Sequence, residues 1–278
     1  MEDNGMNKKI AVLQIDSVLG DPEANLQKID KMLGSIQDTS VRMAVFCEYG
    51  ITGYCMDLTK IADPIPGRTS ERLEQIAKKH NIWISGGTAE LVGDKIANTT
   101  LMVSPKEGVM ATYRKIHPFG DEKNEIVYGD TPVVVDTEIG RVGMTICYDF
   151  VFPELARGLA LQGAEIVLCS TFWFADNTSG PAGWEPEQAL SLARIRALEN
   201  NVFVAMACRT GEELASWGDK VRGFGHSSIA SPVGKTIVSA GLGEAIITAE
   251  IDLEQRKKWA SYANYLNDRR PEIYKLFE

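Results

Sequence analysis

Residues 141–153, Arg141-Val-Gly-Met-Thr-Ile-Cys-Tyr-Asp-Phe-Val-Phe-Pro153, contain the strongest structural signal in the sequence. The apolar run from Gly143 to Ile146 predicts a buried strand, and Pro153 predicts the first turn of a helix. Cys147 therefore lies at a turn between a strand and a helix. A thiol near the positive end of a helix dipole is favoured as thiolate, with a lowered pKa. Alternatively, Cys147 only fills the end of the strand, since free cysteine is among the most buried residue types.

Predicted strands and helices alternate on both sides of this segment. Before it, the pattern predicts strands at 9–15, 41–46 and 82–85, helices at 22–38 and 69–79, and a hairpin at 98–113. After it, the pattern predicts helices at 153–162, 185–199 and from 253, and strands at 165–169, 202–207 and 245–250. Because no linker, repeat or composition break interrupts this order, residues 1–278 are predicted to form one α/β domain. Periodicity fits either two mixed sheets with helices outside or one doubly wound sheet.

The composition is typical of a soluble globular protein, with 278 residues, 44% of them hydrophobic and 24% charged. Lys and Arg total 29 against 38 Asp and Glu, a formal net charge of −9. Binding to a nucleic-acid backbone needs a basic patch, so we expect no nucleic-acid partner. No apolar run approaches the roughly 20 residues of a membrane helix. The first five residues are polar and acidic, unlike a secretory signal, so we expect a cytoplasmic protein without a membrane partner.

The cysteines are odd in number and lack Cys-x-x-Cys spacing: Cys47, Cys55, Cys147, Cys169 and Cys208. In a reducing compartment we expect free thiols rather than disulfides or a zinc site. No His/Cys cluster indicates a metal, and no dinucleotide fingerprint indicates a nucleotide cofactor, so we expect neither. The three histidines do not rule out a Cys–His enzyme, but no pattern supports one.

Two charged residues follow strand-like runs elsewhere in the chain. Glu48 follows the apolar run 41–46 and precedes a glycine-broken loop. A buried carboxyl there has a raised pKa and serves as a base. Lys115 lies in the strand-like run 113–117, where a cation meets a developing oxyanion. Taken singly, each is more often a solvated charge, and their value as a signal comes from appearing together.

These residues lie in segments that resemble the motifs of the nitrilase superfamily of carbon–nitrogen hydrolases, which has a Glu–Lys–Cys triad. The three principal matches are Val45-Phe46-Cys47-Glu48 with Gly53-Tyr54, Tyr113-Arg114-Lys115-Ile116-His117, and Ile146-Cys147-Tyr148-Asp149 with Phe152-Pro153-Glu154. Supporting matches are 193–200, 225–228 and 268–271. The likeness covers nearly the whole chain in order, which makes it far more specific than any one motif.

The resemblance implies roles residue by residue. Cys147 corresponds to the nucleophile, Glu48 to the general base and acid, and Lys115 to the cation that stabilises the oxyanion. Many members have a further active-site glutamate after the lysine. Glu122, seven residues beyond Lys115, fits that spacing better, and Glu125 is the reserve candidate.

The resemblance also implies a four-layer α-β-β-α sandwich, which decides between the two sheet arrangements left open by periodicity. It implies a homodimer or higher homo-oligomer, and no metal or organic cofactor. Many members acting on acid-bearing substrates have an arginine where this chain has Val151. That departure disfavours a carboxylate near the reacting carbonyl.

Aromatic side chains are the candidates for substrate contacts. The run Thr171-Phe172-Trp173-Phe174 follows a strand where the family lines its pocket, and Tyr54 adds a further ring. Tyr148 is expected to contribute its backbone amide. Plain core packing is the alternative for Phe172 and Phe174.

The leading hypothesis is hydrolysis of a small, largely neutral amide, which releases ammonia through a cysteine thioester. The alternatives are a nitrilase or an N-carbamoyl amide hydrolase resembling carbamoylputrescine amidase, which use the same triad. A catalytically silent member that serves as a binding or scaffold protein is the alternative from a different class.

Overall fold

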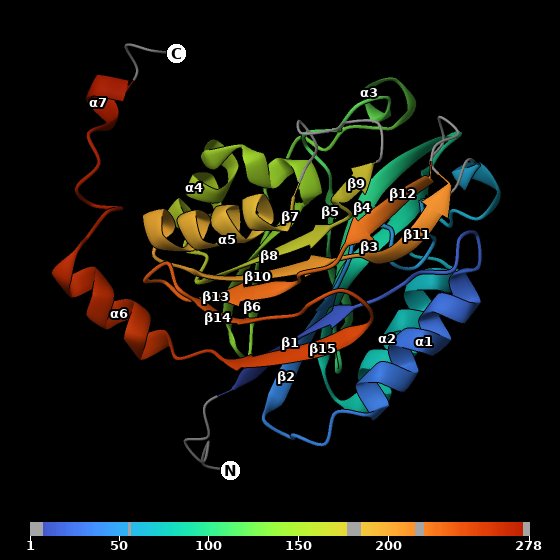
Figure 1. Cartoon of the computed structure of the whole chain (residues 1–278), viewed down its shortest axis with the longest axis horizontal. Helices are drawn as coiled ribbons and strands as arrows, with labels where there is room; N and C mark the ends of the chain where they lie inside the picture. The colour runs from blue at the N-terminus through green and yellow to red at the C-terminus, as the bar shows by residue number, and fades with distance from the viewer. Residues whose placement is uncertain (1–7, 55–56, 177–184, 215–219, 275–278) are drawn as a thin grey trace.

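The computed structural model describes residues 8–54, 57–176, 185–214 and 220–274, so that Cys55 lies outside the described residues. Two six-stranded sheets lie face to face, and helices cover the outer surface of each (Figure 1). This arrangement confirms the predicted α-β-β-α sandwich. Among the described residues, no helix combines the length and apolarity needed to cross a bilayer.

The first sheet has the strand order β15-β1-β2-β3-β4-β5. Its strands are β1 (Lys9–Gln14), β2 (Val41–Phe46), β3 (Trp83–Val92), β4 (Lys95–Ser104), β5 (Gly108–Arg114) and β15 (Ala245–Glu250). The helices on its outer face are α1 (Pro22–Gly34) and α2 (Arg68–His80). Strands β1, β2 and β3 run parallel, and β4 and β5 are joined to β3 as antiparallel hairpins.

The second sheet repeats this plan, with the order β14-β13-β10-β8-β7-β6 and a parallel centre formed by β7, β8 and β10. Its strands are β6 (Val134–Thr137), β7 (Gly140–Ile146), β8 (Ile166–Thr171), β10 (Phe203–Cys208), β13 (Ser228–Ala230) and β14 (Thr236–Ser239). The helices on its outer face are α4 (Pro153–Leu161) and α5 (Pro186–Asn200).

Smaller elements complete the chain. A third sheet, of order β11-β12-β9, comprises β9 (Phe174–Asp176), β11 (Thr210–Leu214) and β12 (Lys220–Phe224). The short helices are η1 (Leu58–Lys60), α3 (Glu122–Glu125), η2 (Cys147–Val151), α6 (Leu253–Tyr262) and α7 (Pro271–Tyr274). Sequence patterns predicted neither the third sheet nor α3. In Figure 1, α6 and α7 extend along the outside of the molecule.

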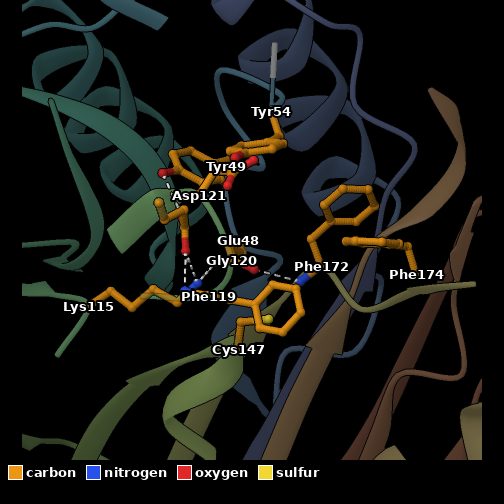
Figure 2. Close-up of a pocket in the computed structure, with 11 residues that line it drawn as sticks. Glu48, Tyr49, Tyr54, Lys115, Phe119, Gly120, Asp121, Cys147, Phe172 and Phe174 are labelled. Atoms are coloured by element: carbon orange, nitrogen blue, oxygen red, sulfur yellow. Dashed lines mark hydrogen bonds and ion pairs between the residues drawn. The ribbon is translucent and has the colours of Figure 1, made fainter. Parts of the chain in front are cut away.

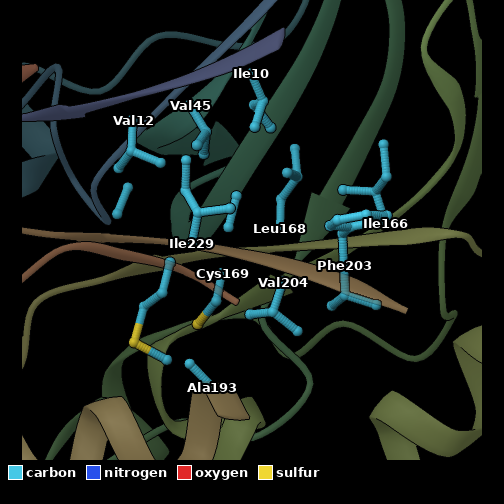
Figure 3. Packing of buried hydrophobic residues seen from close by; sticks show 14 of the residues in the cluster. Ile10, Val12, Val45, Ile166, Leu168, Cys169, Ala193, Phe203, Val204 and Ile229 are labelled. Atoms are coloured by element: carbon cyan, nitrogen blue, oxygen red, sulfur yellow. The ribbon is translucent and has the colours of Figure 1, made fainter. Parts of the chain in front are cut away.

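Strand alternation divides the core into layers. Successive side chains of a strand point to opposite faces. On β1, Val12 accordingly belongs to the cluster between the sheets, whereas Leu13 belongs to the cluster beneath α1 and α2. On β8, Leu168 points toward the first sheet, and its neighbour Cys169 points toward Ala193 of α5 (Figure 3). Each central strand is therefore buried on both faces, which is why it reads as a continuous apolar run.

Strand β3 is longer than predicted, because it continues through Gly86 and Gly87 to Val92. A Cβ atom on Gly86 would lie 2.2 Å from the Phe46 ring, and one on Gly87 would lie 2.8 Å from the Cα of Glu48. These glycines therefore allow a close backbone approach within the sheet rather than ending the strand. A further boundary differs in α1, which ends at Gly34 rather than near residue 38.

Candidate active site

Four residues follow the carboxyl ends of strands at one shared edge of the two sheets. Glu48 lies after β2, Lys115 after β5, Cys147 after β7 and Phe172 after β8. Strands β2, β3 and β5 run in one direction in the first sheet, as do β7 and β8 in the second. Residues separated by up to 124 positions in the chain thereby converge, with a 2.9 Å hydrogen bond from the Phe172 amide to Glu48.

These residues border a cavity of about 200 Å³. The residues that line the cavity are Glu48, Tyr49, Tyr54, Lys115, Phe119, Gly120, Asp121, Glu122, Cys147, Phe172 and Phe174. Figure 2 shows Cys147 at the bottom of the view, Lys115 and Glu48 beside it, and aromatic rings around the space. The cavity thus combines one thiol, three carboxyl groups and one ammonium group.

Lys115 lies at the centre of the charged groups. Its Nζ is 2.7 Å from Glu48 Oε1 and 2.7 Å from Glu122 Oε2, and its side chain is only 2% exposed. Burial opposes the ammonium charge, but Glu48, Cys147 and Glu122 together hold the pKa of Lys115 well above its usual value. The lysine is therefore a fixed positive charge in the site.

Hydrogen bonds hold both carboxylate oxygens of Glu48. Besides Lys115, Oε1 accepts a bond of 2.7 Å from the Asn98 amide, and Oε2 accepts the Phe172 N–H at 2.9 Å. Burial raises the pKa of Glu48, Lys115 opposes that rise and Glu122 adds to it. A carboxyl with a raised pKa is suited to exchanging protons near neutral pH.

Cys147 has a left-handed backbone conformation, with φ of +47°, at the start of η2. Its side chain and that of Glu48 border the same cavity. Burial and the Glu48 charge raise the pKa of Cys147 well above its usual value, against the opposing effect of Lys115. The expectation of a lowered pKa is therefore wrong, because desolvation outweighs the nearby positive charge. The raised pKa favours the neutral thiol over the thiolate.

Glu122 is brought into the same group by the one-turn helix α3. It is 5% exposed, and its oxygens accept bonds from Lys115, Tyr49 and Asn98 and from the amide of Phe119. Glu125 is exposed at the other end of the same turn. Of the two glutamates considered from the sequence, Glu122 contacts Lys115.

The predicted aromatic residues occupy different places. Tyr54 and Phe172 line the cavity, and so does Phe174. Trp173 does not: it is 5% exposed in the core, with its ring 6.3 Å from that of Phe224. Its prediction as a substrate contact is corrected for a simple reason. Neighbouring residues of an extended chain point to opposite sides, so Phe172 and Phe174 face the cavity while Trp173 faces the core.

Tyr148 lies beside the cavity rather than among its lining residues. Its ring makes edge contacts with Phe119 and Phe152, each at 5.1 Å. It therefore supports Phe119, which does line the cavity.

Sequence reasoning missed four side chains at the site, those of Asn98, Tyr49, Phe119 and Asp121. Asn98 had a usable signal, because a polar residue within the apolar strand 96–103 needs buried partners. The other three lie in loops whose paths no periodic pattern reveals. Among the described residues, no group of three His, Cys, Asp or Glu side chains is arranged to hold a metal ion. We assign no residue to the binding of a cofactor.

A family model for carbon–nitrogen hydrolases matches residues 9–261. A nitrilase from Pyrococcus abyssi is 34% identical over 275 residues, which cover 96% of this chain and 98% of the nitrilase. The chain belongs to the carbon–nitrogen hydrolase family. An omega-amidase from Xenopus tropicalis is 35% identical to this hydrolase over 227 residues, or 78% of each chain.

The fold of the hydrolase matches that of an amidase of the nitrilase superfamily from Nesterenkonia AN1. The two agree with a TM-score of 0.82 at 24% identity, over 99% of this chain and 98% of the amidase. A structure of the same amidase in complex with butyramide gives a TM-score of 0.81, at 24% identity and over 99% and 98% of the two chains. Together with the family match, this likeness confirms an enzyme of the nitrilase superfamily with the expected sandwich fold.

Proposed function

We propose that this carbon–nitrogen hydrolase cleaves a small, largely neutral amide and releases ammonia through a thioester on Cys147. One observation carries the proposal. The Cys147 thiol, the Glu48 carboxyl and the Lys115 ammonium border one aromatic-lined cavity, and the ammonium lies 2.7 Å from the carboxyl. A nucleophile, a base and a fixed positive charge are thus within reach of one carbonyl group.

In the first half-reaction, Glu48 takes the thiol proton while the sulfur attacks the carbonyl carbon. Lys115 and the backbone amide of Tyr148 stabilise the resulting oxyanion, a kind of donor whose loss costs roughly 10²–10³ in rate. Glu48 returns the proton to the leaving nitrogen, and ammonia departs. The acyl group is then held as a thioester.

In the second half-reaction, Glu48 removes a proton from a water molecule that attacks the thioester carbonyl. The carboxylic acid leaves, and the sulfur regains its proton. Glu122 orients Lys115 and raises the proton affinity of Glu48 throughout the cycle.

The charges around the cavity support a neutral substrate. Its lining includes three carboxyl groups, of Glu48, Asp121 and Glu122, against the single ammonium of Lys115. That ammonium already contacts two of these carboxylates. Val151 adds no positive charge to η2. A substrate carboxylate next to the reacting carbonyl would therefore meet repulsion without a free partner.

Ammonia release from a matched set of substrates tests this assignment. We expect butyramide to give a higher kcat/KM than butyronitrile, an N-carbamoyl amine of similar length, or an ω-amide with a carboxylate. Nitrile turnover without amide turnover would overturn the choice in favour of a nitrilase. No turnover of any of them, together with no selective alkylation of Cys147, would favour a silent binding protein.

We further propose that the chain acts as a single cytoplasmic domain that forms a homodimer or higher homo-oligomer. Large apolar side chains are exposed on the outer helices, including Leu161 (52%) on α4, Ile195 (49%) on α5 and Tyr262 (83%) on α6. Light scattering of the purified protein should give at least twice the 30.5 kDa chain mass, and Ile195→Lys should lower it. A monomeric wild type contradicts the proposal.

A further inference from the structure

A fully buried carboxylate behind Cys147 connects the two catalytic segments. Asp149 lies in η2 with 0% exposure. Its Oδ2 accepts the backbone N–H of Ile146 at 2.9 Å and the hydroxyl of Tyr113 at 2.7 Å. Its Oδ1 accepts the backbone N–H of His117 at 2.9 Å and lies 2.9 Å from Nδ1 of the same residue.

The positions of these partners in the chain are informative. Ile146 directly precedes Cys147 at the end of β7, in the second sheet. Tyr113 and His117 lie two residues before and two residues after Lys115, at the end of β5 in the first sheet. One carboxylate therefore joins the backbone beside the nucleophile to both flanks of the lysine.

The contacts suit a carboxylate specifically. An ionised carboxylate only accepts hydrogen bonds and has about four lone-pair sites. The partners of Asp149 are two backbone N–H groups, one hydroxyl and one imidazole nitrogen, which donates in the tautomer with its proton on Nδ1. In Asp149→Asn, an NH₂ group would replace one carboxylate oxygen. Its hydrogens would face hydrogen-bond donors, so the bonds that this oxygen accepts would be lost. Burial makes such losses costly, because water does not replace them.

We propose that Asp149 is a positioning residue for the hydrolase reaction, which sets the separation between the Cys147 sulfur and the Lys115 ammonium. It touches neither the substrate nor the reacting atoms. It acts through Ile146, which fixes the strained backbone at Cys147, and through the residues on either side of Lys115. The inference rests on the proposed roles of Cys147 and Lys115.

Three variants test the hydrogen bonds of Asp149 from the carboxylate and from its partners. Asp149→Asn disrupts the carboxylate to which all the partners bond. Tyr113→Phe removes the hydroxyl that bonds Oδ2, and His117→Phe removes the bond from Nδ1 while keeping a ring to stack on Phe152, 4.0 Å away in the native protein. The matched control is Ser227→Ala, which removes a buried hydroxyl that bonds only the backbone of Cys208, between β10 and β13.

The readouts are kcat and KM for butyramide, the rate of Cys147 alkylation by iodoacetamide, and Tm. We expect Asp149→Asn to lower kcat about 30- to 100-fold with KM within about threefold, the pattern of a lost transition-state interaction. Tyr113→Phe and His117→Phe should each lower kcat about three- to tenfold. Cys147 alkylation should slow in the same order. Ser227→Ala should lower Tm only.

An unchanged kcat and alkylation rate in Tyr113→Phe and His117→Phe would overturn the inference, even if Asp149→Asn fails to fold. A parallel rise in KM would also overturn it, because that pattern indicates a damaged pocket. Alkylation does not depend on the substrate. If the wild type cleaves no amide, the proposed function fails. Slower alkylation of Cys147 in the three variants would then still support the positioning role of Asp149.

Discussion

Two buried ionic groups contact Phe172 and behave differently. In the first, the backbone amide of Phe172 donates to Glu48, which is paired with Lys115. In the second, the guanidinium of Arg209 lies 4.7 Å from the centre of the Phe172 ring and is paired with Glu213. Both pairs have side chains that are almost fully buried.

The difference is in how completely the charges are satisfied. Both oxygens of Glu48 accept hydrogen bonds, and Lys115 contacts two carboxylates. Apart from their ion pair, the Glu213 oxygens and two guanidinium nitrogens of Arg209 lack hydrogen-bond partners among the described residues. Burial accordingly raises the pKa of Glu213 to about 7, with Arg209 opposing and Asp16 adding to the rise. A buried charge alone therefore does not mark an active site.

Among the substitutions that test this comparison, we expect the largest loss of kcat at Cys147. Cys147→Ala should lower kcat for butyramide more than about a thousandfold, as loss of an essential nucleophile does. Because only a small thiol is removed, Tm should change little. Activity above roughly a thousandth of wild type would refute covalent catalysis by this residue.

The next effect concerns the fixed positive charge. Lys115→Gln should lower kcat roughly 10²–10³-fold, the cost of a lost oxyanion partner. It also leaves Glu48 and Glu122 facing each other, so part of the variant should take up a proton rather than unfold. Lys115→Arg should recover little activity, since a planar guanidinium does not replace a compact ammonium. Near-normal kcat in the arginine variant would mean that the oxyanion partner lies elsewhere.

Glu122 and Glu125 provide an internal control on one helical turn. Glu122→Gln should lower kcat roughly 10²-fold, because it removes the carboxylate that orients Lys115 and raises the proton affinity of Glu48. The net charge of Glu48, Lys115 and residue 122 then changes from −1 to zero. Lys115 stays paired with Glu48, so Tm should stay nearly unchanged. Glu125→Gln should change neither quantity. If Glu125→Gln were the damaging substitution, the spacing argument would have selected the wrong glutamate.

The smallest effect on catalysis is expected at the second ionic group. Glu213 holds its proton more tightly in the folded state, because its pKa rises from 4.5 to about 7. Between these values the folded state binds more protons, so the free energy of unfolding falls as pH rises. Relative to Glu213→Gln, the free energy of unfolding of the wild type should fall by up to about 2.5 kcal/mol between pH 5 and pH 8.

Urea titrations of both proteins at the two pH values measure this difference directly. The kcat of Glu213→Gln should stay within about twofold of wild type, because the residue neither lines the cavity nor bonds to Glu48. A large loss of kcat in Glu213→Gln, with an unchanged pH dependence of stability, would contradict the conclusion that the two ionic groups differ in role.

The sequence predicted the parts of this site that depend on strand ends. Glu48, Lys115 and Cys147 each follow a recognisable apolar run, and parallel strands bring such ends to one edge. The role expected for Glu122 came from spacing within a resemblance, since its loop lacks any period. Trp173 was misplaced because sequence alone does not show which of two alternating faces meets the cavity.

Other features depend on contacts that are distant in the sequence. Gly86 and Gly87 look like a strand end, and only the close approach of Phe46 and Glu48 explains why they lie within β3. The direction of the Cys147 pKa shift also required the structure. A strand-to-helix turn is visible in the sequence, but the depth of burial that raises the pKa is not.

Trapping the acyl-enzyme tests the central claim most directly. Wild-type protein is mixed with butyramide, quenched in acid within milliseconds, digested and analysed by mass spectrometry. The account predicts a butyryl mass increment on the peptide containing Cys147, absent from those containing the other four cysteines, Cys47, Cys55, Cys169 and Cys208. Steady ammonia release with no increment on Cys147 at any quench time, or an increment on another residue, would contradict it.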